Sequence, residues 1–243
     1  MSARYPGNYD LYARQTPAQT LGPFFRQGLV RTRSVFASEA LCADERDVFH
    51  QYLASESTPG ERLRIEGVVY DGLEQPIPDA VVEIWQADAA GRYAHPVYEH
   101  AHPATVLGAT ASTGEGVAKG FLGFGRAPTD DAGRYFFETI KPGRVPGLGG
   151  SVQAPHINLV LGARGMSRFA FSRIYFPEDV ELAQDPVLER VPAPRRRTLI
   201  AERRAPGAPS AGLSATASPG VAAAVYVFDI HLQGERETVF FDF

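Results

Sequence analysis

The sequence predicts an all-β fold, an antiparallel β-sandwich with an irregular N-terminal arm and short helical excursions. Short apolar runs mostly alternate with polar residues, which is the pattern of half-buried strands. The 19 prolines and 24 glycines of the chain punctuate these runs and mark turns between them. No strand-helix alternation of the kind that builds a parallel sheet is present.

Seven segments carry strand patterns. Arg62 to Asp71 alternates and then turns at Asp71-Gly72, whereas Ala80 to Ala87 is richer in apolar residues and leads into the turn Asp88 to Gly91. In chain order the expected strands are residues 62–71, 80–87, 134–140, 156–161, 169–176, 225–232 and 237–243. Short strands at such spacing, with turn residues between them, are typical of a sandwich or barrel.

Two segments have helical patterns, and two more look irregular. Ser38 to Leu53 is weakly periodic, and Pro186 to Arg204 contains a short amphipathic stretch with three consecutive arginines, Arg195 to Arg197. Those arginines favour a solvated helix face over an anion site. Residues 113–125 form a Gly-rich insertion that does not open a helix, so a phosphate loop is not expected there. Residues 205–224 are rich in Ala, Pro, Ser and Gly, a composition that predicts a flexible loop.

The bulk composition indicates one soluble globular domain over residues 1–243, with residues 1–37 as the arm. Apolar residues make up 44% of the chain and charged residues 21%, which is ordinary for a folded protein. The formal charge of −4 gives no reason to expect nucleic acid or an anionic membrane as a partner. The one cysteine, Cys42, excludes an internal disulfide framework. With no apolar targeting segment, the sequence predicts a cytoplasmic protein.

The densest group of metal-ligand side chains lies in the loop Arg92 to Pro103. It contains His95, His100 and His102. Imidazole and phenolate are good ligands for oxidised iron, so this loop is one candidate metal site. A polar surface loop that binds nothing is the interpretation that the residues alone favour.

His156 and Asn158 open the apolar run QAPHINLVL and point to the same face of the expected strand. Asn158 is a poor ligand for ferric iron, because its amide nitrogen carries no free lone pair. His156 is then better explained as a core histidine bonded to backbone than as a ligand. No Gly-x-Ser-x-Gly motif occurs and Cys42 lacks a nucleophile signature, so we expect no catalytic nucleophile.

Several phrases, taken together, resemble a known family. They are TPAQTLGPF (16–24), VVEIWQADAAGRY (81–93), TIKPG (139–143), APHI (154–157), GARG (162–165) and GERETVFFDF (234–243). In this order they are similar to the intradiol ring-cleavage dioxygenases, and most of all to the α subunits of protocatechuate 3,4-dioxygenases. The resemblance covers nearly the whole chain.

The resemblance implies a β-sandwich and a chemistry based on ferric iron, Fe³⁺, held by two tyrosines and two histidines. Such enzymes use dioxygen to cleave protocatechuate to 3-carboxy-cis,cis-muconate. In this chain the ligand positions fall on Tyr93, Val145, His156 and Asn158, and an assisting arginine falls near Gln153. Val145 has no donor atom and Asn158 replaces a histidine. We therefore expect no metal site and no catalytic residue in this chain.

The same resemblance implies a partner. The iron would be bound by a β subunit, and the two chains would form an (αβ)n assembly around a small aromatic substrate. The residues carried over to the substrate pocket are Thr20, Gly22, Pro23, Phe24 and Arg164. Two alternatives stay open at this point. One is a catalytically silent β-sandwich binding module, and the other is a self-sufficient catechol dioxygenase that draws ligands from the loop with His95, His100 and His102.

Overall fold

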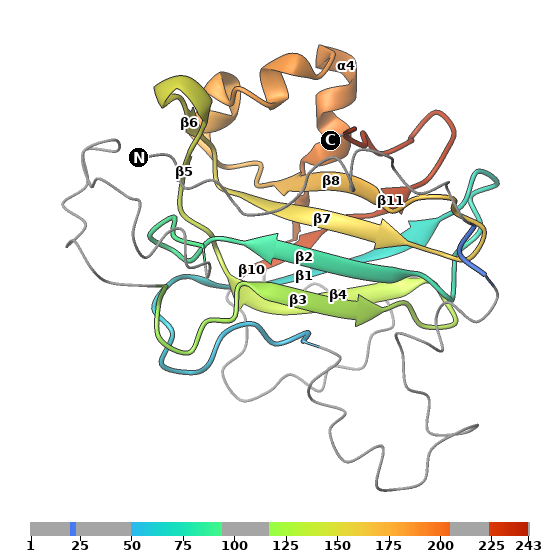
Figure 1. The fold of residues 1–243 in the computed structure, drawn as a ribbon, viewed down its shortest axis with the longest axis horizontal. Coiled ribbons are helices and arrows are strands. Elements are labelled where there is room, and N and C mark those ends of the chain that lie inside the picture. The colour runs from blue at the N-terminus through green and yellow to red at the C-terminus, as the bar shows by residue number, and fades with distance from the viewer. Residues whose placement is uncertain (1–19, 23–49, 94–116, 205–223, 243) are drawn as a thin grey trace, which may run out of the picture.

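Two β-sheets lie face to face in the computed structural model, which describes residues 20–22, 50–93, 117–204 and 224–242 (Figure 1). This arrangement confirms the predicted β-sandwich. The front sheet in Figure 1 has the order β3-β2-β7-β8, and every pairing in it is antiparallel. Its strands are β2 (Val81–Gln86), β3 (Phe124–Pro128), β7 (His156–Gly162) and β8 (Ala170–Tyr175).

The second sheet is mixed rather than purely antiparallel. Its strands are β1 (Arg62–Tyr70), β4 (Arg134–Ile140), β9 (Glu202–Arg204), β10 (Ala224–Val227) and β11 (Ile230–His231). β4 pairs with β1 and β9 pairs with β10 in antiparallel fashion. β10 and β11, however, both run parallel to β1. The expectation of antiparallel pairing is therefore wrong for these two pairs.

β10 and β11 are one run of chain with a single register against β1, as the expected strand 225–232 implies. The run is interrupted at Phe228 and Asp229, where the side chain of Asp229 accepts the Val68 backbone N–H at 2.9 Å. Gly67 lies opposite this interruption. A Cβ at Gly67 would lie 1.9 Å from the Phe228 carbonyl oxygen, so only glycine permits this close approach.

The core lies between the two sheets and is built from alternate residues of each strand. Ile65 of β1 and Phe137 of β4 are fully buried, and Ile84 of β2 and Leu159 of β7 are each only 1% exposed. All four belong to one hydrophobic cluster. The alternation that predicted these strands is thus the consequence of one face packing against the opposite sheet.

Short helical turns cover the β8 edge of the front sheet, where the amphipathic stretch was expected (Figure 1). They are the 3₁₀ turns Val180–Gln184, Leu188–Arg190 and Arg197–Leu199 and the single α-helical turn α4 (Ala193–Arg196). Leu188 and Leu199 are buried in a second cluster with Tyr175 of β8. A further 3₁₀ turn, Leu148–Gly150, joins β5 (Val145–Pro146) to β6 (Val152–Gln153).

The structure differs from the expectation in four segments. One is β9 (Glu202–Arg204), a strand at the end of the stretch expected to be helical. Residues 50–53 of the expected helix are extended, and Tyr52 bridges to Glu138. Residues 237–242 form no strand and keep only an isolated bridge between Phe171 and Phe241. Conversely, β3 includes the end of the Gly-rich insertion, where no strand was expected.

Other expectations lie outside the described residues. These are the arm except for residues 20–22, residues 38–49 of the expected helix, Pro23, Phe24, Cys42, His95, His100, His102, residues 113–116, and the flexible loop except for Ala224. Within the ranges that the structure describes, no helix is long and apolar enough to cross a membrane.

Candidate functional site

The four positions that the family resemblance assigns to metal ligands come together at one end of the front sheet. The Tyr93 hydroxyl lies 3.5 Å from Nε2 of His156, and Nδ2 of Asn158 donates to the same hydroxyl at 3.3 Å. Val145 packs with Tyr93 and Ala87 in a small buried cluster. The indole of Trp85 stacks on the Tyr93 ring at 6.0 Å between centroids.

The turn after β2 holds Tyr93 in this position. Asp88 is fully buried, and its carboxylate accepts the backbone N–H groups of Ala90, Arg92 and Ala118 at 2.9 to 3.0 Å. At Gly91, which has φ of +78°, a Cβ would lie 2.0 Å from the carbonyl oxygen of residue 144. The turn therefore sits directly against the segment that leads into Val145.

His156 is a neutral, buried histidine. Its Nδ1 lies 2.8 Å from the carbonyl oxygen of Ala154, which can only accept, so Nδ1 carries the hydrogen. Burial, with a smaller contribution from the Arg173 guanidinium, lowers the pKa of His156 to about 4. Nε2 is then an acceptor at neutral pH, and the Tyr93 hydroxyl is placed to donate to it.

A second polar network adjoins this group, and its arginine, Arg173, was not among the residues singled out from the sequence. Arg173 lies on β8 opposite Asn158 on β7. It donates to Oε1 of Gln153 at 2.6 Å, so a guanidinium lies next to the position where the family resemblance expects an assisting arginine. Asp185, which is fully buried, accepts the Tyr175 hydroxyl at 3.0 Å.

These residues do not fit a ferric ion. Val145 offers no donor atom, and Nδ2 of Asn158 donates to the Trp85 carbonyl and to Tyr93. Tyr93 and His156, the two ligand types that remain, are directed at each other. In the described part of the chain, no group of three or more His, Cys, Asp or Glu side chains is arranged to hold a metal. The degenerate ligand set is a closed hydrogen-bonded cluster.

Of the residues expected to contact substrate, the structure describes Thr20, Gly22 and Arg164, which lie at the opposite end of β7. Leu21 donates its N–H to the Met166 carbonyl at 2.7 Å and accepts the N–H of Gly165 at 2.9 Å. The arm residues Thr20 and Gly22, both exposed, are thereby placed beside the turn that carries Arg164. The Arg164 side chain is 59% exposed and forms an ion pair with Asp79.

The two ends are too far apart to contact one small ligand. β7 begins at His156 and ends at Gly162, two residues before Arg164. At about 3.3 Å per residue the strand alone separates them by roughly 20 Å. If Arg164 binds an aromatic substrate, the reacting centre cannot be the Tyr93–His156 cluster of the same chain.

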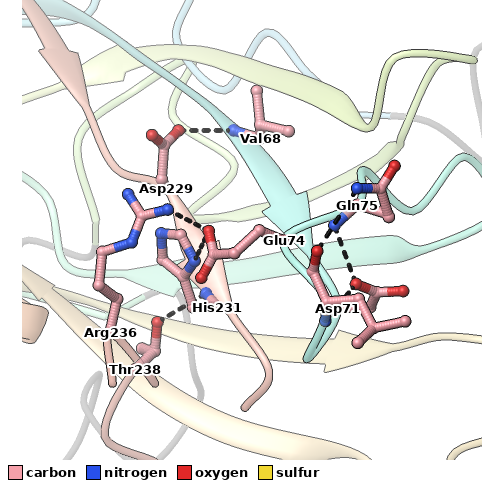
Figure 2. A network of polar contacts seen from close by, with 9 residues as sticks. Val68, Asp71, Glu74, Gln75, Asp229, His231, Arg236 and Thr238 are labelled. Carbon is pink, nitrogen blue, oxygen red and sulfur yellow. Dashed lines mark hydrogen bonds and ion pairs between the residues drawn. The ribbon is translucent and has the colours of Figure 1, made fainter. Parts of the chain in front are cut away.

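A third polar cluster, which the sequence did not point to, joins the β1–β2 connection to the segment after β11 (Figure 2). The Glu74 carboxylate contacts Arg236 and lies 3.4 Å from Nδ1 of His231. The His231 ring stacks on Tyr70 at 4.9 Å between centroids. Glu74 has a φ of +59° and is the only non-glycine residue with a positive φ in the part of the chain that the structure describes.

Comparison with known proteins gives a consistent result. Residues 36–234 match the family described as "Dioxygenase". The chain is 36% identical over 233 residues to the protocatechuate 3,4-dioxygenase alpha chain of Burkholderia cepacia, covering 94% of this chain and 98% of that one. It is 30% identical to the beta chain from the same organism, over 95% and 89% of the two chains. Hydroxyquinol 1,2-dioxygenase from Pseudomonas putida DLL-E4 shares the fold, with a TM-score of 0.54 at 18% identity over 75% of this chain and 59% of that one.

Proposed function

Because the chain belongs to the intradiol dioxygenase family, we propose that it is the iron-free α subunit of a protocatechuate 3,4-dioxygenase. It acts with a β subunit in an (αβ)n assembly that cleaves protocatechuate with dioxygen to 3-carboxy-cis,cis-muconate. We place this assembly in the cytoplasm and treat residues 1–243 as one domain. The observation that carries the proposal is the closed cluster of Tyr93, His156 and Asn158, which takes up the donor atoms that a metal would need.

Two further observations support an α-type role. The identity to the Burkholderia cepacia alpha chain is 36%, against 30% for the beta chain, and both matches extend over almost the whole chain. In addition, Arg164, Thr20 and Gly22 are exposed and distant from the chain's own degenerate site. Residues so placed are accessible to a partner subunit.

In this proposal the β subunit binds ferric iron, which supplies the oxygen chemistry. This chain supplies part of the pocket wall, through Thr20, Gly22, Pro23, Phe24 and Arg164. The role of Arg164 comes from the family resemblance, and its chemistry agrees with that role, because an exposed guanidinium pairs well with a carboxylate such as the one on protocatechuate. The two backbone hydrogen bonds of Leu21, with Met166 and Gly165, hold arm residues 20–22 beside the turn that carries Arg164.

The test uses the chain co-expressed with its β partner. Arg164→Ala should reduce kcat/KM for protocatechuate roughly tenfold or more, because a charged hydrogen bond to the substrate is lost. Arg168→Ala is the matched control, since Arg168 is four residues away, is 68% exposed and forms an ion pair with the exposed Asp242. Equal effects of the two substitutions, or no complex with the β subunit at all, would refute the proposal and favour a silent binding module.

A further inference from the structure

We propose that Asp79 is the positioning residue for Arg164 and that it sets the direction in which the guanidinium faces the substrate carboxylate. This inference rests on the proposed function, because it takes Arg164 as a residue of the substrate pocket. It adds a residue to that pocket for which neither the sequence motifs nor the chemistry of the arm gave a signal. Asp79 acts through Arg164 and is not placed in contact with substrate.

Strand register brings the two side chains together. β2 and β7 pair in antiparallel fashion with Val81 opposite Gly162. Asp79 and Arg164 lie two residues beyond this pair, each in the turn next to its strand. Oδ2 of Asp79 lies 3.1 Å from Nε of Arg164. The Asp79 side chain is 17% exposed and the Arg164 side chain 59%, so the carboxylate is the fixed member of the pair.

The backbone that carries Asp79 is held firmly. Thr129 is fully buried, and its hydroxyl donates to the Ile77 carbonyl at 2.8 Å and accepts the Ala80 N–H at 2.9 Å. These two bonds bracket Asp79 on both sides. The Ile77 N–H also bonds to the Val69 carbonyl of β1 at 2.9 Å.

The beginning of the same connection is anchored separately (Figure 2). The Asp71 carboxylate accepts the N–H groups of Leu73 and Gln75 at 2.8 and 2.9 Å. Glu74 then contacts Arg236 and lies beside His231. Asp79 therefore lies in a loop whose start and end are both held by hydrogen bonds or ion pairs. A residue that positions another side chain needs such a rigid support.

The contact leaves the substrate-facing part of Arg164 available. Oδ2 of Asp79 approaches the guanidinium at Nε, and the Arg164 side chain remains 59% exposed. The two terminal nitrogens form the edge that binds a carboxylate in a bidentate manner. A guanidinium held at Nε loses less freedom when substrate binds than a free exposed arginine does, so Asp79 should lower KM rather than raise kcat.

The experiment measures KM and kcat of the αβ holoenzyme for protocatechuate in a double-mutant cycle. Asp79→Ala should raise KM by roughly 1.5- to fivefold, the range of an exposed ion pair, with kcat nearly unchanged. Asp79→Asn should have a similar effect to Asp79→Ala, because the contact is an ion pair and the amide carries no charge. In the Arg164→Ala background, Asp79→Ala should change KM no further. Asp242→Ala, at an exposed ion pair with Arg168, is the matched control and should leave KM unchanged.

The outcomes separate this inference from the function on which it rests. If Arg164→Ala raises KM but Asp79→Ala does not, only the role of Asp79 is wrong. If Asp79→Ala raises KM equally with and without Arg164, Asp79 acts through general structure and the inference is also wrong. If Arg164→Ala itself leaves KM unchanged, the proposed pocket fails and the positioning role fails with it.

Discussion

Acidification should destabilise this protein through His156. Burial holds the pKa of His156 at about 4, below its ordinary value of 6.5. The folded state therefore resists protonation while the unfolded chain accepts a proton, and stability falls as the pH drops from 6.5 towards 4. At 1.36 kcal/mol per pKa unit, the full loss is about 3 kcal/mol, and about 2 kcal/mol of it should appear between pH 7 and pH 5. His156 is fully buried, so solvent screening does not reduce this figure.

The assay is denaturant unfolding of the chain at several pH values between 7 and 4.5. The comparison is His156→Asn, whose amide can still donate to the Ala154 carbonyl but does not titrate. The variant should be less stable at pH 7, because a ring is removed from a packed site, yet its stability should fall by about 2 kcal/mol less between pH 7 and pH 5. Parallel pH profiles for the two proteins would refute the assignment of His156 as a neutral buried histidine.

Substitutions at three further positions test single features of the fold by denaturant unfolding. Asp185→Asn should cost about 2–3 kcal/mol, because the buried carboxylate accepts several hydrogen bonds that an amide cannot all replace; a cost below about 1 kcal/mol would contradict this. Gly67→Ala should destabilise by at least about 2 kcal/mol, since its Cβ would overlap the Phe228 carbonyl, and a neutral result would show that the strand can shift. Glu74→Gly should be about 1 kcal/mol more stable than Glu74→Ala; both lose the contact with Arg236, and only glycine relieves the positive φ.

Strands with alternating or strongly apolar patterns were predictable from the sequence, because one face of each strand packs in the core. β4 begins and ends as expected, and β1 and β2 differ from the expectation by a residue at their ends. β3 was missed because Gly125 and Pro128 oppose a strand pattern. A Cβ at Gly125 would lie 2.8 Å from the His50 carbonyl oxygen, so the glycine marks a close approach of a distant segment rather than a turn.

The site was predictable only in part. The motif phrases identified Tyr93, Val145, His156 and Asn158, and the structure brings these four residues together. The residues that contact the site from neighbouring strands could not be predicted from the sequence. Arg173 next to Gln153 and Asp79 next to Arg164 depend on how β2, β7 and β8 align, and pairing between distant strands leaves no local signal.

The central claim is that this chain holds no iron of its own and completes a site on another subunit. Metal analysis with visible absorbance, on the isolated chain and on the complex with its β partner, tests it most directly. We expect the isolated chain to contain negligible iron and to lack a tyrosinate-to-iron absorbance band. The reason is that Tyr93 and His156 are hydrogen-bonded to each other and Val145 has no donor atom. We expect the complex to contain iron and to show the tyrosinate-to-iron absorbance band. Stoichiometric iron with visible absorbance in the isolated chain would contradict the claim and favour a self-sufficient dioxygenase with ligands from the loop that contains His95, His100 and His102.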